Sequence, residues 1–180
     1  MLTERLVRRF VTDADKVNDP RVRGAYGKLA GIAGIAANVL LFLGKVLAGV
    51  LSGSVAVIAD AFNNLSDAGS SVVTLVGFRL SSAPPDKEHP FGHGRVEYLS
   101  ALTVAALIML AGVELATSAV EKILNPAVTE FSWVAAAILA ASIAVKAWMA
   151  HFNRTIGRRI RSDALAASAA DSRNDVISYE

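Results

Sequence analysis

Long apolar stretches separated by short polar segments dominate this sequence and limit the folds that it can adopt. The first stretch, residues 29–51, has Lys45 as its only charged side chain. A helix of about 20 apolar residues crosses the hydrocarbon core of a bilayer, which is about 30 Å thick. We therefore predict membrane-spanning helices at 29–51, 55–80, 97–120 and 131–150, and a fifth, incomplete span at 164–180. The predicted fold is an all-α, polytopic helical membrane protein in which we expect a C-terminal truncation.

The composition agrees with a membrane bundle and excludes several other classes of protein. Hydrophobic residues make up 53% of the chain and the mean hydropathy is +0.45, which is high for a soluble domain. The sequence has no cysteine, which excludes disulfides and thiolate metal sites. The formal net charge is only +2, and the basic residues lie at the edges of the apolar stretches. This pattern argues against nucleic acid as a partner.

Lysine and arginine are distributed unevenly among the segments outside the predicted spans. Seven lie in the leader 1–28, which includes a short amphipathic stretch at 6–11, three lie in or beside the loop 81–96, and four lie in the link 151–163. The turn 52–54 has none, and the connection 121–130 has one. Because cytoplasmic segments are enriched in lysine and arginine, we expect a cytoplasmic N-terminus.

Four polar residues in the predicted second and fifth spans have the spacing of a cation site. Asn63 and Asp67 are four residues apart, and Asp171 and Asp175 repeat this spacing. Side chains four apart lie on one face of a helix. Carboxylates inside a membrane are costly and usually mark an ion path. Two helices that each offer two oxygen ligands can hold one divalent cation between them.

Structural interpretations of the same residues remain open at this point. Asp67 could pair with Lys45 or Lys146, and Lys45 itself could snorkel or pair with an intramembrane acid. Asn63 alone is more often a hydrogen-bonding residue between helices than a ligand. The stretch that holds Asp171 and Asp175 could be an exposed helix. Two neighbours, Asp60 and Asn64, are candidates for lining an access path, although Asp60 could equally serve helix packing or capping.

Other features of the spans and the loop carry weaker signals. Small residues let membrane helices approach closely, so we expect such contacts at four glycines of the first span: Gly31, Gly34, Gly44 and Gly49. In the loop, the spacing of Asp86, His89 and His93 would allow a second metal site, or the histidines could order the loop through hydrogen bonds to the backbone. The sequence has no HExxH motif, which argues against a metal-dependent hydrolase and for a protein that is not an enzyme.

Three segments together resemble a known family of transporters. They are SGSVAVIADAFNNLSDAGSSVV, DKEHPFGHGRVEYLSAL and ADSRNDVIS, and they occur in the expected order on the predicted spans. The sequence resembles the cation diffusion facilitators, which export divalent metals in exchange for protons. The resemblance implies a metal site at Asn63, Asp67, Asp171 and Asp175, a six-span homodimer and a cytoplasmic metal-binding domain after the last span. It also makes a bacterial inner membrane the expected location.

The residue types at these positions favour some metals over others. Zinc-selective relatives have two aspartates on the second span and a histidine and an aspartate on the fifth. Asn63 and Asp171 replace an aspartate and the histidine in this chain. Because an all-oxygen ligand set suits harder ions than an imidazole does, the combination resembles the manganese branch. We expect Mn²⁺, with Fe²⁺ second and Zn²⁺ third.

The charges also suggest how metal export is coupled to proton entry. Carboxylates that face one another gain affinity for protons, and a divalent ion would displace those protons. Asp67, Asp171 and Asp175 would therefore exchange metal for protons. The alternative function is a truncated, non-transporting subunit that dimerises with a full-length exporter and regulates it.

Overall fold

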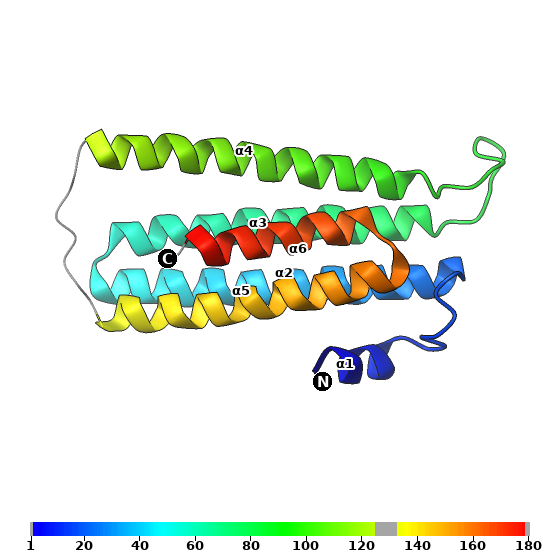
Figure 1. Ribbon diagram of the computed structural model, residues 1–180, viewed down its shortest axis with the longest axis horizontal. Helices are drawn as coiled ribbons and strands as arrows, with labels where there is room; N and C mark the ends of the chain where they lie inside the picture. The colour runs from blue at the N-terminus through cyan, green and yellow to red at the C-terminus, as the bar shows by residue number, and fades with distance from the viewer. Residues whose placement is uncertain (1, 125–132, 179–180) are drawn as a thin grey trace.

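The computed structural model describes residues 2–124 and 133–178, and within these ranges the α-helix is the only regular secondary structure. Six helices follow one another in these ranges: α1 (Leu2–Phe10), α2 (Pro20–Ser52), α3 (Val55–Ser81), α4 (Val96–Leu124), α5 (Trp133–Ile160) and α6 (Asp163–Ser178). The long helices run along a common axis (Figure 1). The predicted all-α helical bundle is confirmed.

Helix α2 begins well before the predicted span at residue 29, and its start is encoded locally. Asp19 is the N-cap, and its side chain accepts a hydrogen bond from the Arg21 backbone N–H at 2.8 Å. Pro20 occupies the first helical position, where a missing N–H costs nothing. The last part of the predicted leader is therefore the first part of α2. At the other end, Gly53 has a left-handed backbone with φ of 65°, which ends α2 and turns the chain into α3.

The segment 151–163, which we interpreted as a link between spans, is helical through Ile160, so α5 extends ten residues past the predicted end of the fourth span. Nothing in its first ten residues breaks a helix, and Gly157 packs against Leu165 of α6. Helix α5 ends where Arg161 adopts a left-handed backbone with φ of 52°. The Ser162 N–H then donates to the Gly157 carbonyl at 2.9 Å, and Ser162 Oγ accepts a hydrogen bond from the Leu165 N–H.

The five long helices pack as one bundle. The most extensive contacts are between α2 and α3 and between α5 and α6, and α6 also contacts α4. Figure 1 shows α6 between α4 and α5, with α1, the loop 82–95 and the α5–α6 turn at the same end of the bundle. The α2–α3 turn lies at the opposite end. The basic segments counted in the sequence therefore lie together at one end of the structure.

Three of the four glycines predicted to lie at close helix contacts do so. A Cβ atom at Gly31 would lie 2.7 Å from Leu75 Cβ, one at Gly34 would lie 2.6 Å from Ser71 Oγ, and one at Gly49 would lie 2.5 Å from a side-chain carbon of Ile58. All three partners are on α3, so these glycines allow α2 and α3 to approach closely. The prediction for Gly44 is wrong for the part of the chain that the structure describes, because a Cβ there would meet nothing within 4 Å.

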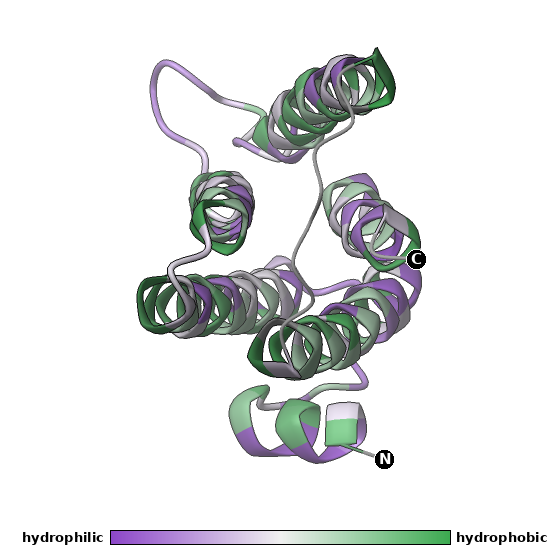
Figure 2. Ribbon diagram, turned by 90° about the vertical axis from the view of Figure 1, so that its left-hand side faces the viewer, coloured by the Kyte–Doolittle hydropathy of each residue, from purple (hydrophilic) through white to green (hydrophobic). Residues whose placement is uncertain are grey.

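The distribution of apolar side chains is that of a membrane bundle. Among the described residues, three helical stretches are long and apolar enough to cross a membrane: Pro20–Ser52, Val96–Glu121 and Ala136–Ile160. Large hydrophobic side chains such as Leu40, Leu47, Met109 and Leu110 are exposed on the outside. In the end-on view of Figure 2, α1 has a hydrophobic side toward the bundle and a hydrophilic side away from it, as expected for the amphipathic stretch. Val7 and Val11 are buried there in the same hydrophobic cluster as Ile156 and Ile160.

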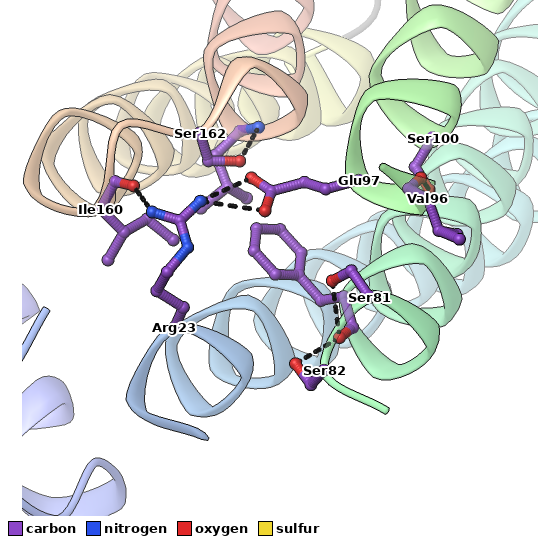
Figure 3. Close-up of polar contacts among 10 residues, drawn as sticks. Arg23, Ser81, Ser82, Val96, Glu97, Ser100, Ile160 and Ser162 are labelled. Carbon is purple, nitrogen blue, oxygen red and sulfur yellow. Dashed lines mark hydrogen bonds and ion pairs between the residues drawn. The ribbon is translucent and has the colours of Figure 1, made fainter. Parts of the chain in front are cut away.

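An ion pair joins three helices at the end of the bundle where the basic segments lie. Arg23 of α2 donates to both carboxylate oxygens of Glu97 on α4, at 2.9 and 3.1 Å, and also to the Ile160 carbonyl at the end of α5 (Figure 3). The Glu97 side chain is 14% exposed. A bidentate arginine pair of this kind fixes orientation as well as distance. It fixes the start of α4 to the rest of the bundle.

Candidate metal centre

Three of the four residues predicted as metal ligands lie together inside the bundle. One carboxylate oxygen from each of Asp67 on α3, Asp171 on α6 and Asp175 on α6 lies within 4.8 Å of the other two. All three residues are half-buried. Carboxylate oxygens grouped from two helices are ligands that divalent cations accept. The structure therefore brings the predicted second and fifth spans together at these side chains.

Helix α6 presents its two aspartates to the bundle because of how it packs. Asp171 and Asp175 share one face, and the same helix buries Ala164, Leu165, Ala169 and Ser172 against its neighbours. The alternative in which this stretch is an exposed helix is therefore wrong. Small side chains on α6 let it pack closely against α5, which brings its carboxylates near those of α3.

A lysine lies among these carboxylates. Lys146 of α5 donates to Asp67 Oδ2 at 2.5 Å and to Asp175 Oδ2 at 2.6 Å. Its side chain is 1% exposed, against 18% for Asp67 and 30% for Asp175. The alternative pairing of Asp67 with Lys146 is thus confirmed as a contact, and the same ammonium also binds the fifth-span residue Asp175. A buried lysine requires such partners.

The remaining residues that the sequence singled out on α3 have different surroundings. Asn63 is exposed on α3, and its side chain forms no hydrogen bond with the aspartates in the described part of the chain. Asp60 forms an ion pair with Lys45 at 2.8 Å. This pair explains how the only charge of the first predicted span is accommodated. Asn64 is buried, and neither polar atom of its carboxamide has a hydrogen-bond partner among the described residues.

Two buried polar residues near the aspartates were not predicted from the sequence. The contacts of Gly31 with Leu75 and of Gly34 with Ser71 fix the register of α2 and α3, and this register places Asn38 level with Asp67. The Asn38 Oδ1 atom is buried and has no partner among the described residues. Ser142 lies one turn before Lys146 on α5, and its Oγ is also buried and unpaired there. Buried polar atoms are normally hydrogen-bonded. An asparagine and a serine inside apolar helices could therefore have indicated from the sequence that these two residues have a polar partner.

The loop 82–95 holds the second candidate group. Asp86 Oδ1 lies 3.3 Å from His89 Nδ1, and Asp86 Oδ2 lies 3.5 Å from His93 Nε2. The three side chains offer ligand atoms that lie within 4.8 Å of one another. The backbone N–H of His89 donates to Asp86 Oδ1 at 2.6 Å, and this hydrogen bond is the main cause that lowers the pKa of Asp86 below its usual value. The predicted second site thus has a compact geometry outside the spans.

A basic groove of about 630 Å³ lies between α5 and α6. Four arginines, Arg154, Arg158, Arg161 and Arg173, line it together with His151, one acid, Asp163, and mostly small residues. None of these arginines forms an ion pair with an acid in the described ranges. Asp67, Asp171 and Asp175 do not line this groove. Its charge makes it a surface that would attract anions.

Comparison with known proteins places this architecture in one family. Residues 31–179 match the family model of the cation efflux transmembrane domain. The chain is 33% identical over 151 residues to the manganese efflux system protein MneS of Bacillus subtilis, covering 84% of this chain and 52% of that protein. It is 32% identical over 151 residues to MneP of the same organism, another manganese efflux system protein, covering 83% of this chain and 50% of that protein. It is also 34% identical over 161 residues to metal tolerance protein C1 of Arabidopsis thaliana, covering 81% of this chain and 34% of that protein. The chain spans about half the length of the two bacterial relatives.

Proposed function

Because the chain belongs to the cation efflux transmembrane-domain family, we propose that it exports Mn²⁺ in exchange for protons through a site made by Asp67, Asp171 and Asp175. The observation that supports this most directly is the meeting of three carboxylates from α3 and α6 within 4.8 Å. Fe²⁺ and Zn²⁺ follow as alternative substrates. Asn63 is the fourth proposed ligand, and it would reach the ion only if its side chain turned toward the aspartates.

The preference for manganese rests on two supports. The ligand set contains oxygen atoms and no imidazole, and carboxylate, carbonyl and water ligands suit Mn²⁺ better than Zn²⁺. Two relatives at 32–33% identity are named manganese efflux system proteins. Asp171 stands at the position where zinc-selective members of the resembled family have histidine. Replacing this oxygen ligand with an imidazole should therefore shift the preference toward zinc.

Proton coupling follows from the charges of the proposed ligands. Three carboxylates in one small site repel one another, and protons or a divalent ion relieve this repulsion. When the site faces the cytoplasm, metal would replace protons; when it faces outward, protons would replace metal. Alternating access in such transporters is a rocking of helix groups around a fixed central site. The α2–α3 and α5–α6 contacts are the most extensive in the bundle and support such a division, with Asp67 on α3 and Asp171 and Asp175 on α6.

The proposed setting is a bacterial inner membrane with a cytoplasmic N-terminus and a homodimeric assembly. The uneven distribution of lysine and arginine supports the orientation. The basic groove between α5 and α6 lies at the same end as the basic segments, and it supports contact with anionic lipid headgroups. The loop group Asp86, His89 and His93 is proposed as a second, separate metal site at that end.

Flux measurements in proteoliposomes test this function. The chain is reconstituted, a pH gradient is imposed, and uptake of Mn²⁺, Fe²⁺ and Zn²⁺ is compared between the wild type and two variants. Asp67→Asn removes a proposed ligand, whereas Glu114→Gln removes a carboxylate of α4 that lies outside the site. We expect Mn²⁺ flux in the wild type and in Glu114→Gln, and none in Asp67→Asn. Equal flux in all three would contradict the site; no flux in any would favour the non-transporting, regulatory subunit.

A further inference from the structure

Lys146 lies inside the proposed metal site, but the transport cycle described above gives it no task. Its Nζ contacts Asp67 Oδ2 at 2.5 Å and Asp175 Oδ2 at 2.6 Å, and thus connects α3, α5 and α6. The side chain is 1% exposed, so solvent does not stabilise its charge. The ammonium is therefore a cation held between two of the three proposed ligands.

A divalent ion and this ammonium cannot both bind these two oxygen atoms at low cost. Zn²⁺ and Mg²⁺ lie about 2.0–2.2 Å from carboxylate oxygens, and the larger Ca²⁺ lies at about 2.3–2.6 Å. Because Nζ lies no more than 2.6 Å from either oxygen, an ion on the same oxygens would lie at most about 5 Å from Nζ, whatever its direction. Repulsion between a double and a single positive charge at this separation is large in a buried site.

Another acceptor is available to the displaced ammonium. Ser142 lies one turn before Lys146 on α5, and its buried Oγ has no hydrogen-bond partner among the described residues. Long side chains on helices point back toward the preceding turn. Lys146 can thus turn from the aspartates toward Ser142, with its charge retained and part of its hydrogen bonding restored.

We propose that Lys146 occupies the cation position of the aspartate group when no metal is bound, and that a divalent ion binds by displacing it. This inference rests on the proposed metal site and adds a residue that sets its specificity. A monovalent ion would replace one single charge with another and gain little. A divalent ion gains about twice the attraction from the same carboxylates. Lys146 thereby excludes Na⁺ and K⁺ and keeps α3 and α6 together between transport steps.

The affinity for Mn²⁺ tests this proposal. Binding is measured at pH 8 by equilibrium dialysis of the detergent-solubilised chain, for the wild type, Lys146→Met and Lys45→Met. Lys45 is the matched control because it is an equally buried lysine that pairs with Asp60, which is not a member of the aspartate group. We expect Lys146→Met to bind Mn²⁺ about tenfold more tightly than the wild type, since a competing unit charge is gone. Lys45→Met should bind within about threefold of the wild type.

The outcomes separate this inference from the proposed function. If Lys146→Met binds Mn²⁺ no more tightly than the wild type, and wild-type binding depends on Asp67, then the proposed displacement is overturned and the metal site stands. An equal gain in Lys45→Met would overturn it as well, because the effect would then be a general one of charge. Wild-type binding that does not depend on Asp67 would instead overturn the proposed site, and the inference with it.

If Lys146→Met does not fold, a measurement on the wild type tests the same proposal. Lysine acylation by an amine reagent is followed by mass spectrometry at increasing Mn²⁺ concentration. Displacement predicts that acylation of Lys146 rises several-fold as the site fills, because the amine leaves its two carboxylates. Acylation of Lys45 in the same sample should stay constant. A constant Lys146 signal over the range in which Mn²⁺ binds would overturn the proposal.

Discussion

Arg23 of α2 donates two hydrogen bonds to the carboxylate of Glu97 on α4, at 2.9 and 3.1 Å. The pair is mostly buried, with 29% of the arginine side chain and 14% of the glutamate side chain exposed. Glu97→Gln should lower the free energy of unfolding by about 1–3 kcal/mol, between the values for exposed and buried pairs. Thermal unfolding in detergent measures this change.

The matched control for Glu97→Gln is Glu4→Gln. Glu4 also pairs with an arginine, Arg159, but at 3.4 Å and with half of its side chain exposed. An exposed pair contributes about 0–1 kcal/mol, so this variant should unfold close to the wild-type temperature. Equal losses in both variants would show that the Arg23 pair contributes no more than a surface contact.

The α2–α3 interface predicts opposite effects for two glycine substitutions on the same helix. A Cβ at Gly31 would lie 2.7 Å from Leu75 Cβ and 3.1 Å from Leu75 Cα, so Gly31→Ala should force the helices apart and cost about 1–3 kcal/mol. Gly44→Ala meets nothing within 4 Å and should be neutral or slightly stabilising, because alanine is the better helix former. Thermal unfolding of both variants checks the difference. Equal destabilisation would contradict the register of α2 and α3.

Ser142 should matter for metal binding only while Lys146 is present. Ser142→Ala removes the acceptor proposed for the displaced ammonium and should weaken Mn²⁺ binding a few-fold in the wild-type background. In the Lys146→Met background, the same substitution should have no effect. The comparison is a double-mutant cycle, which isolates coupling between neighbouring residues. Independent effects of the two substitutions on the Mn²⁺ dissociation constant would show that Ser142 does not receive the ammonium.

The turn formed by Asp86 should persist well into the acidic range. The His89 N–H holds the pKa of Asp86 below its usual value of about 3.9. A carboxylate with a lowered pKa contributes stability above its unfolded pKa and loses that contribution as the pH falls through its folded pKa. Hydrogen exchange, corrected for intrinsic rates, should therefore show a protected His89 amide from neutral pH down to about pH 4. Asp86→Ala should lose the protection throughout, and loss in the wild type near pH 6 would contradict this interpretation.

Some parts of the fold and of the site follow from local sequence, and others depend on packing between distant segments. The apolar stretches and the Gly53 turn locate the α2–α3 pair, and the four-residue spacings identify Asp67, Asp171 and Asp175 from the sequence alone. The start of α2 is also encoded in the sequence, as Asp19 followed by Pro20. The hydropathy of the first stretch instead placed the start of the span at residue 29. By contrast, the basic residues at the end of α5 suggest a link between spans, although charge alone does not end a helix.

The position of Lys146 shows what the sequence could not supply. The chain has two lysines inside predicted spans, and each could have paired with Asp67. The choice depends on the register of α5 against α3 and α6, which is set by contacts such as that of Gly157 with Leu165. In the resulting structure, Lys45 meets Asp60, and Lys146 bridges Asp67 and Asp175. Asn63 is the opposite case. Its spacing to Asp67 predicts a metal ligand, but its side chain is exposed in the structure.

The proposed metal site is tested most directly by the number of Mn²⁺ ions that Asp67, Asp171 and Asp175 bind. Binding is measured by equilibrium dialysis in the Asp86→Ala background, which removes the loop group, and Asp175→Asn is compared with Asp60→Asn. We expect about one Mn²⁺ per chain in the Asp86→Ala protein and in its Asp60→Asn derivative, and none in the Asp175→Asn derivative. If Asp175→Asn binds Mn²⁺ as tightly as its parent, then Asp67, Asp171 and Asp175 do not form the metal site, and the proposed transport mechanism is wrong.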